Sequence, residues 1–171
     1  ATSATHDVGV TDLMDAIVEY LPSPADRNEL QIIDNKEEKI IQLNETEDLF
    51  AYVFKSFSDP NVGDISYVRV FSGKMTSGSD VYIPEKDSKD RIGSMYYVNG
   101  KNRVDADELK AGDIGGLVKM KIARGFDSIV NTNSKRRFRD IKLPTPVYWQ
   151  AIKAANQHDE DKIGAAMAKL L

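Results

Sequence analysis

The chain has 171 residues, of which 41% are hydrophobic and 29% charged, and its formal net charge is −4. This composition is ordinary for a soluble globular protein, and it excludes a globally basic surface that would attract nucleic acid from every side. No apolar run approaches the ~18 residues of a membrane-spanning helix, and the lack of cysteine excludes disulfides and thiolate metal sites. We therefore expect a cytoplasmic protein with no membrane partner.

The first predicted element is a helix in GVTDLMDAIVEYLPSP, residues 9–24. Thr11 is a suitable N-cap and Asp12 a favourable first-turn residue. Pro22 and Pro24 end the helix because proline lacks an amide donor. The apolar residues follow helical spacing: Leu13, Met14, Ile17, Val18 and Leu21. A stripe on so short a helix needs a partner surface, which suggests that the chain begins inside a larger protein.

Residues 25–47 are charged, with two apolar pairs, Ile32-Ile33 and Ile40-Ile41, on either side of the turn-like sequence DNKEE. We interpret this segment as a linker with a small edge hairpin.

Residues 48–140 change to a period of two, which is typical of strands. In ISYVRVF, Ser66, Val68 and Val70 fall on one face, and Ile65, Tyr67, Arg69 and Phe71 on the other. Asn99-Gly100 predicts a hairpin, and Gly63, Gly73 and Gly78 surround short strands as sharp corners would. Many short strands with glycine corners predict a mainly β fold, a closed antiparallel β-barrel.

After Pro144 and Pro146 the pattern changes again. VYWQAIKAAN predicts one strand that carries Trp149, and QHDEDKIGAAMAKLL predicts a helix with acidic residues in its first turn. We expect residues 141–171 to be the truncated start of an α/β unit.

No motif for chemistry stands out. There is no G-x-x-x-x-G-K-[ST] loop, GDIGG at 112–116 lacks the strand-then-helix context of a dinucleotide site, and HDED at 158–161 is explained by a helix start without a metal. The aromatic residues Phe50, Tyr52, Phe54 and Phe57 are compatible with a base-stacking platform or with one wall of the core, and their strand spacing favours the core.

Several stretches resemble elongation factor G, the ribosomal translocase family of translational GTPases. DPNVGDISYVRVFSGKMTSGSDVY and RIGSMYYVNGKNRVDADELKAGDIGGLVKMK resemble its β-barrel second domain. GVTDLMDAIVEYLPSP is similar to the last helix of its GTPase domain, and LPTPVYWQAIKAANQHDEDKIGAAMAKLL to the start of its third domain. The resemblance implies a GTPase-domain tail at 1–24, a linker at 25–47, the barrel at 48–140 and a truncated third domain at 141–171.

The resemblance implies that the parent protein binds GTP and magnesium, docks on the ribosome and promotes translocation. Ser3 and Ala4 fall on the family's last guanine-contacting loop, but the phosphate loop and magnesium ligands are missing from the sequence. We therefore expect this piece to be no enzyme, to hold no cofactor, and to act as a ribosome-docking and domain-relay piece. Its expected partners are small-subunit ribosomal RNA and the parent's GTPase and C-terminal domains.

Docking on RNA requires lysine and arginine on exposed loops, where they meet phosphates. The candidate contacts lie in one loop, after the Asn-Gly turn and in SKRRFRDIK: Lys86, Lys89, Arg91, Lys101, Arg103, Lys135, Arg136, Arg137 and Arg139. Each residue is also compatible with ordinary surface solubilisation. A ribosomal protection protein of the same family and a stand-alone β-barrel interaction module remain alternatives, and an independent enzyme is the weakest.

Overall fold

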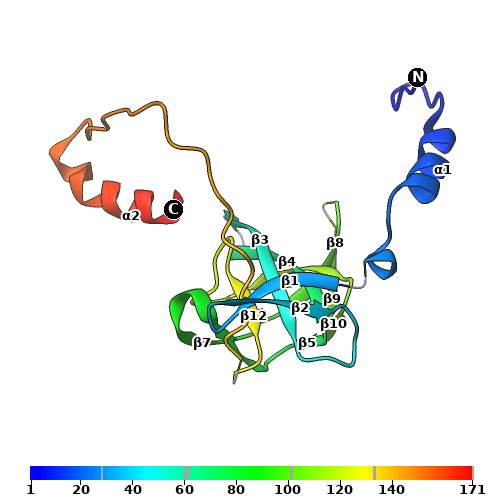
Figure 1. Ribbon diagram of the computed structural model, residues 1–171. Helices are drawn as coiled ribbons and strands as arrows, with labels where there is room; N and C mark the ends of the chain where they lie inside the picture. Colours follow the sequence, from blue (N-terminus) through cyan, green and yellow to red (C-terminus); the bar gives the residue numbers. More distant parts are fainter. Residues whose placement is uncertain (28, 60–61, 101, 133, 171) are drawn as a thin grey trace.

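The computed structural model describes residues 1–27, 29–59, 62–100, 102–132 and 134–170 (Figure 1). Strands dominate it, which confirms the mainly β prediction. Figure 1 shows helices α1 and α2 lying away from a β-rich body formed by the middle of the chain. None of the described helices is long and apolar enough to cross a membrane.

One eight-stranded antiparallel sheet makes up most of the body, in the order β7-β6-β12-β3-β4-β11-β8-β9. Its strands are β3 (Phe50–Asp59), β4 (Gly63–Ser72), β6 (Asp80–Ile83), β7 (Ser88–Arg91), β8 (Met95–Asn99), β9 (Asn102–Ala106), β11 (Ile114–Val118) and β12 (Ser128–Val130). A separate pair joins β5 (Lys74–Thr76) to β10 (Glu108–Lys110). Across the described residues, strand pairing does not join β7 to β9, so the predicted closed ring is not seen as a continuous ladder.

The β5–β10 pair continues strands β4 and β11 beyond a bend. Gly73 has φ +67° and separates β4 from β5, and Gly112 has φ +97° and lies just before β11. Hydrogen bonds across the bend, from Ala111 N to Gly73 O and from Gly112 N to Val70 O, measure 3.1 and 2.8 Å. The bend is therefore a hydrogen-bonded corner.

The glycines that flank the short strands have the conformation that their predicted role requires. Gly63, Gly73 and Gly78 all have positive φ, which side chains with a Cβ rarely adopt. At Gly73 a Cβ would also lie 2.6 Å from Glu47 O. The prediction that these glycines are corners is confirmed.

The main core lies on the inner face of the curved sheet. Val68 and Val70 are fully buried there, whereas Tyr67 and Phe71 belong to clusters on the other face. The core also contains Val53, Met75, Val81, Ile83, Leu109, Leu117 and Ile129. The alternation in ISYVRVF therefore predicted the two faces of β4 correctly.

The predicted linker forms a hairpin that packs on the body. Strands β1 (Glu29–Asp34) and β2 (Glu37–Gln42) pair around Asn35 and Lys36, both with positive φ, as in the two-residue turns that suit hairpins. Ile32 is fully buried against Phe50 and Val130. Figure 1 shows the hairpin lying across the front of the body. The small hairpin expected in residues 25–47 is therefore confirmed, and it packs against the body.

The terminal segments contribute little to the core. Helix α1 spans Val10–Tyr20 and buries no residue, followed by the short helix η1 (Pro24–Asp26). The N-cap of α1 is Gly9 rather than the predicted Thr11. Gly9 has a left-handed conformation (φ +66°), and the helix therefore starts two residues earlier than predicted. Asp12 lies in the first turn, as predicted.

Residues 141–154 have no regular secondary structure, so the strand predicted around Trp149 is wrong. A strand needs a neighbour to accept its backbone hydrogen bonds, and in the described chain none pairs with this segment. The predicted final helix is confirmed: η3 (Gln157–Asp159) leads into α2 (Glu160–Leu170), with Glu160 and Asp161 in the first turn.

Candidate nucleic-acid interface

A buried carboxylate holds the loop 119–124 against edge strand β7. Asp90 Oδ1 accepts hydrogen bonds from the backbone N–H of Arg91 (2.8 Å) and Lys121 (3.4 Å). Its Oδ2 accepts from the N–H of Ile122 (2.7 Å) and Ala123 (3.1 Å). Burial alone would raise the pKa of Asp90, but these four donors outweigh it, and the pKa lies below its ordinary value.

Four exposed basic residues lie next to Asp90 on its strand or on the loop that it holds, and we call them the basic edge: Lys89, Arg91, Lys119 and Lys121. Lys89 and Arg91 flank Asp90 on β7, and Lys119 and Lys121 lie on the loop that Asp90 holds. Within the described residues none of the four is in an ion pair, although Arg91 Nε donates to Gly78 O at 2.9 Å. The basic edge is therefore positive charge available to a partner.

Lys89 and Arg91 are among the residues predicted from the sequence, whereas Lys119 and Lys121 are not. In VKMK, Val118 and Met120 are buried while the two lysines are exposed. Alternation of lysine with buried apolar residues was the available signal. This alternation does not show that Asp90 brings residues 119–124 beside β7.

Lys86 serves the fold more than the surface. It lies in the short helix η2 (Pro84–Lys86), and its Nζ lies 2.7 Å from Asp127 Oδ2 and donates to Ile122 O at 2.8 Å. Asp127 is buried. The neighbouring Glu85 accepts a hydrogen bond from Ser128 N at 3.0 Å, and burial raises its pKa. The ammonium group of Lys86 therefore interacts mainly with Asp127 and Ile122 of the protein itself.

The β8–β9 hairpin presents one described candidate. Arg103 lies over the ring of Tyr96, 5.1 Å from its centroid, and its Nη2 is 3.5 Å from Asp59 Oδ2. Lys101 lies outside the residues that the structure describes.

The basic run at 135–139 is mostly neutralised by carboxylates, two of them far away in sequence. Arg136 pairs with Asp48 at 3.3 Å, Arg137 with Asp140 at 2.5 Å, and Arg139 with Glu38 at 2.5 Å. Between them Phe138 packs into the cluster under the β1–β2 hairpin. Lys135 is exposed and is the residue of this run that keeps its charge for solvent.

Ser3 and Ala4 lie in a short turn before α1. Ser3 and Val8 exchange backbone N–H···O bonds of 2.9 and 3.1 Å, and Ser3 Oγ lies 3.0 Å from His6 Nδ1. Ala4 is exposed. No group of three or more metal-binding side chains occurs in the residues that the structure describes.

The aromatic residues of β3 divide between core and surface. Phe50 and Tyr52 are buried, as the core interpretation predicts, but Phe54 and Phe57 are 41% and 37% exposed. Val53 pairs with Val68 and Lys55 with Tyr67, so Phe54 is an extra residue in a β-bulge. A bulge changes the direction of the side chains that follow it, and this one places Phe54 and Phe57 beside Tyr67, at ring distances of 6.3 and 5.4 Å.

Comparisons with known proteins bear on the region that contains this surface. Residues 48–132 match the family described as elongation factor G domain 2. The chain is 39% identical over 169 residues to elongation factor G of Rhodopseudomonas palustris (strain BisB18), covering 98% of this chain and 24% of that protein. It is 38% identical over 170 residues to elongation factor G of Orientia tsutsugamushi (strain Boryong), with the same coverage.

A crystal structure of a protein from Thermus thermophilus has the same fold, with a TM-score of 0.73 at 24% identity over 99% of this chain and 23% of that one. The chain thus spans about a quarter of the length of the curated relatives that it matches.

Proposed function

Because this chain belongs to the elongation factor G family, with residues 48–132 as its second domain, we propose that it docks a GTP-driven translocase on the ribosome. The parent would act in the cytoplasm, where it would bind GTP and magnesium through domains outside these 171 residues and promote translocation. The chain itself would carry no GTPase activity. The observation that supports docking is the basic edge, four exposed cations without an ion-pair partner among the described residues of the family-matched domain.

The proposed partner surface is the phosphate backbone of small-subunit ribosomal RNA. A protein with a net charge of −4 gains affinity for RNA only where cations gather locally. Asp90 fixes the loop of Lys119 and Lys121 through three backbone N–H groups, so the backbone that carries these two lysines is ordered before binding. Less conformational entropy is then lost on docking.

The relay role rests on apolar side chains that the described fold leaves uncovered. Helix α1 exposes 58% of Met14 and 82% of Val18, and residues 141–154 expose 78% of Trp149. Apolar side chains gathered on one element are characteristic of contact surfaces. We propose that they contact the GTPase and C-terminal domains of the parent, so that movement of those domains reaches the second domain.

Sedimentation with small ribosomal subunits across a salt series tests docking. The double variant Lys119→Glu with Lys121→Glu changes the charge by the same amount as the control Lys36→Glu with Lys142→Glu, whose lysines are exposed elsewhere. Each phosphate contact adds about 0.7–0.9 to the slope of log affinity against log salt. We expect the first variant to lose about 1.5 of slope and at least about tenfold in affinity at low salt.

Two results would contradict docking through the basic edge. One is equal loss in the test and control variants, which would show only a general charge effect. The other is unchanged affinity in the Lys119 and Lys121 variant while the unmodified chain binds in a salt-sensitive manner.

A further inference from the structure

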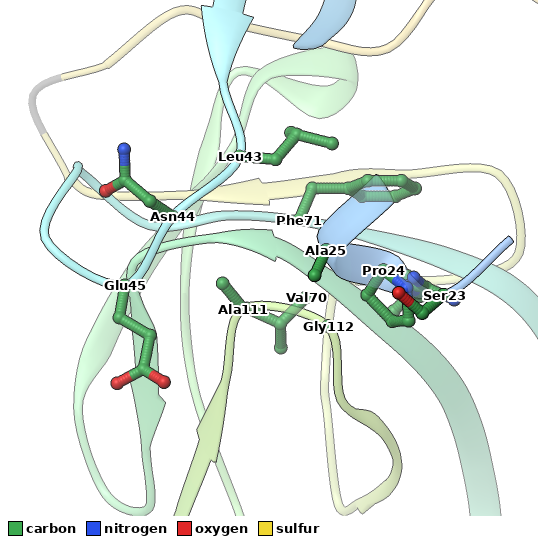
Figure 2. A pocket seen from close by; sticks show the side chains of 11 residues that line it. Ser23, Pro24, Ala25, Leu43, Asn44, Glu45, Val70, Phe71, Ala111 and Gly112 are labelled. Atoms are coloured by element: carbon green, nitrogen blue, oxygen red, sulfur yellow. The ribbon is translucent and has the colours of Figure 1, made fainter. Parts of the chain in front are cut away.

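A groove separates the η1 segment from the outer face of the sheet. Two adjoining hollows of about 450 and 560 Å³ form it, and five residues line both of them: Ser23, Pro24, Leu43, Arg69 and Phe71. Figure 2 shows Leu43, Phe71 and Pro24 around the first hollow, with Glu45 at its far end. Each volume is in the range of small-molecule sites, about 300–1,000 Å³.

Arg69 lines both hollows and gives the groove a cation that has no ion-pair partner among the described residues. Its Nε is buried and makes no hydrogen bond in the described structure, and no carboxylate pairs with its guanidinium there. The guanidinium carbon lies 5.7 Å from the centroid of the Phe71 ring, within the range of a cation–π contact. A buried donor without an acceptor is costly, and a planar guanidinium suits the paired oxygens of a phosphate or carboxylate.

The second hollow adds a further cation and aromatic faces. Arg27, Tyr52, Phe54 and Ile114 line it together with Arg69, and none of its lining residues is acidic. The bulge in β3 leaves the Phe54 ring 41% exposed here. Glu45 lines only the first hollow and lies 3.9 and 3.8 Å from the Nζ atoms of Lys74 and Lys110. The second hollow is thus the cationic and aromatic end.

We propose that this groove binds a nucleoside phosphate, with the phosphate at Arg69 and Arg27 and the base against Phe54. An anion joined to a flat ring satisfies both the free guanidinium and the exposed aromatic face, since bases stack on aromatic side chains irrespective of sequence. The groove differs from the basic edge, because β6, β12 and β3 lie between β7 and β4 in the sheet. The site therefore does not depend on docking through β7.

Titration of the isotope-labelled chain with adenosine 5′-monophosphate, followed by NMR, tests the proposal without ribosomes. We expect saturable shifts of the Arg69 Nε–H and of the Leu43 and Ile114 methyl groups. Adenosine alone and inorganic phosphate alone should each bind at least about tenfold more weakly, because each offers half of the contacts. A 5′-phosphorylated oligoadenylate that binds at least as tightly as the mononucleotide would assign the site to single-stranded RNA, and a weaker one to free nucleotide.

Three variants sharpen the test. Arg69→Gln and Arg27→Gln should each weaken binding of adenosine 5′-monophosphate at least about fivefold, whereas the control Arg103→Gln, which changes an arginine outside the groove, should leave it unchanged. Arg27 is exposed, so its variant threatens the fold least. The proposal is overturned if millimolar nucleotide shifts none of these groups, if neither groove variant weakens binding, or if benzoate, an aromatic carboxylate, binds as tightly as the nucleotide.

Discussion

The buried Asp90 carboxylate holds the loop 119–124 against β7, and Asp90→Asn tests how much this contributes to stability. The substitution keeps the size of the side chain but replaces one acceptor oxygen by an NH₂ group. In the native protein, the backbone nitrogen atoms of Ile122 and Ala123 lie 2.7 and 3.1 Å from Asp90 Oδ2. If the NH₂ group takes the place of Oδ2, it faces these two N–H groups. Two hydrogen bonds to a charged group are then replaced by donors facing donors.

The expected loss follows from these contacts. A hydrogen bond to a charged acceptor contributes about 1.5–3 kcal/mol, and Asp90 is only 7% exposed, so water does not replace what is lost. Since one oxygen still accepts from Arg91, we expect the free energy of unfolding to fall by about 3 kcal/mol at pH 7. The exposed Asp105 makes a matched control, and Asp105→Asn should change stability by less than about 0.5 kcal/mol.

The pH dependence provides a second, independent readout. The folded pKa of Asp90 is depressed, whereas the unfolded value is about 3.9. Its stabilisation is therefore complete above the unfolded pKa and is lost as the pH falls through the folded pKa. Urea denaturation followed by circular dichroism should show the gap between the native chain and Asp90→Asn narrowing below about pH 4. A gap under about 0.5 kcal/mol at pH 7, or one independent of pH, would refute the reasoning.

Two further predictions concern the corners and the N-terminal turn. Gly73→Ala should lower the free energy of unfolding by at least about 2 kcal/mol in urea titrations, because φ is +67° and a Cβ would meet Glu47 O at 2.6 Å. Gly100→Ala, with a similar φ of +60° but open space around it, should cost only about 1 kcal/mol, and equal losses would remove the steric argument. In the Arg69→Gln variant, whose groove should bind nucleotides more weakly, titration calorimetry should detect no binding of GTP, since the turn of Ser3 and Ala4 alone offers too few contacts for a triphosphate; a micromolar dissociation constant in that variant would contradict this.

The features that were predictable from the sequence are those that local rules determine. Strand alternation in residues 65–71 predicted both faces of β4, and Asn99-Gly100 predicted the β8–β9 hairpin, although Asn99 itself belongs to β8 and pairs with Asn102. Glycine positions predicted the corners because positive φ is a property of a single residue. These signals need no knowledge of distant neighbours.

The candidate site was less predictable because its electrostatics depend on long-range pairing. Arg136 is neutralised by Asp48, which lies 88 positions earlier (136 − 48). Lys86 is used by Asp127, and Lys119 is placed beside β7 by a loop that Asp90 holds. A run of basic residues does not show which charges meet a carboxylate after folding, so the pairing of Arg136, Arg137 and Arg139 could not be predicted from the sequence.

The bridge between Ile33 and Arg137 has a mechanical consequence. The two residues exchange backbone hydrogen bonds of 2.9 and 2.8 Å, and they lie before and after the family-matched domain. Tension applied between α1 and the C-terminal segment therefore reaches this two-bond clip before it reaches the strands of the sheet. While these two hydrogen bonds hold, the tension passes directly from Ile33 to Arg137. The residues between them, which include the second domain, are then not stretched. The clip is thus the first backbone pairing of the β-rich body that such a pull would load.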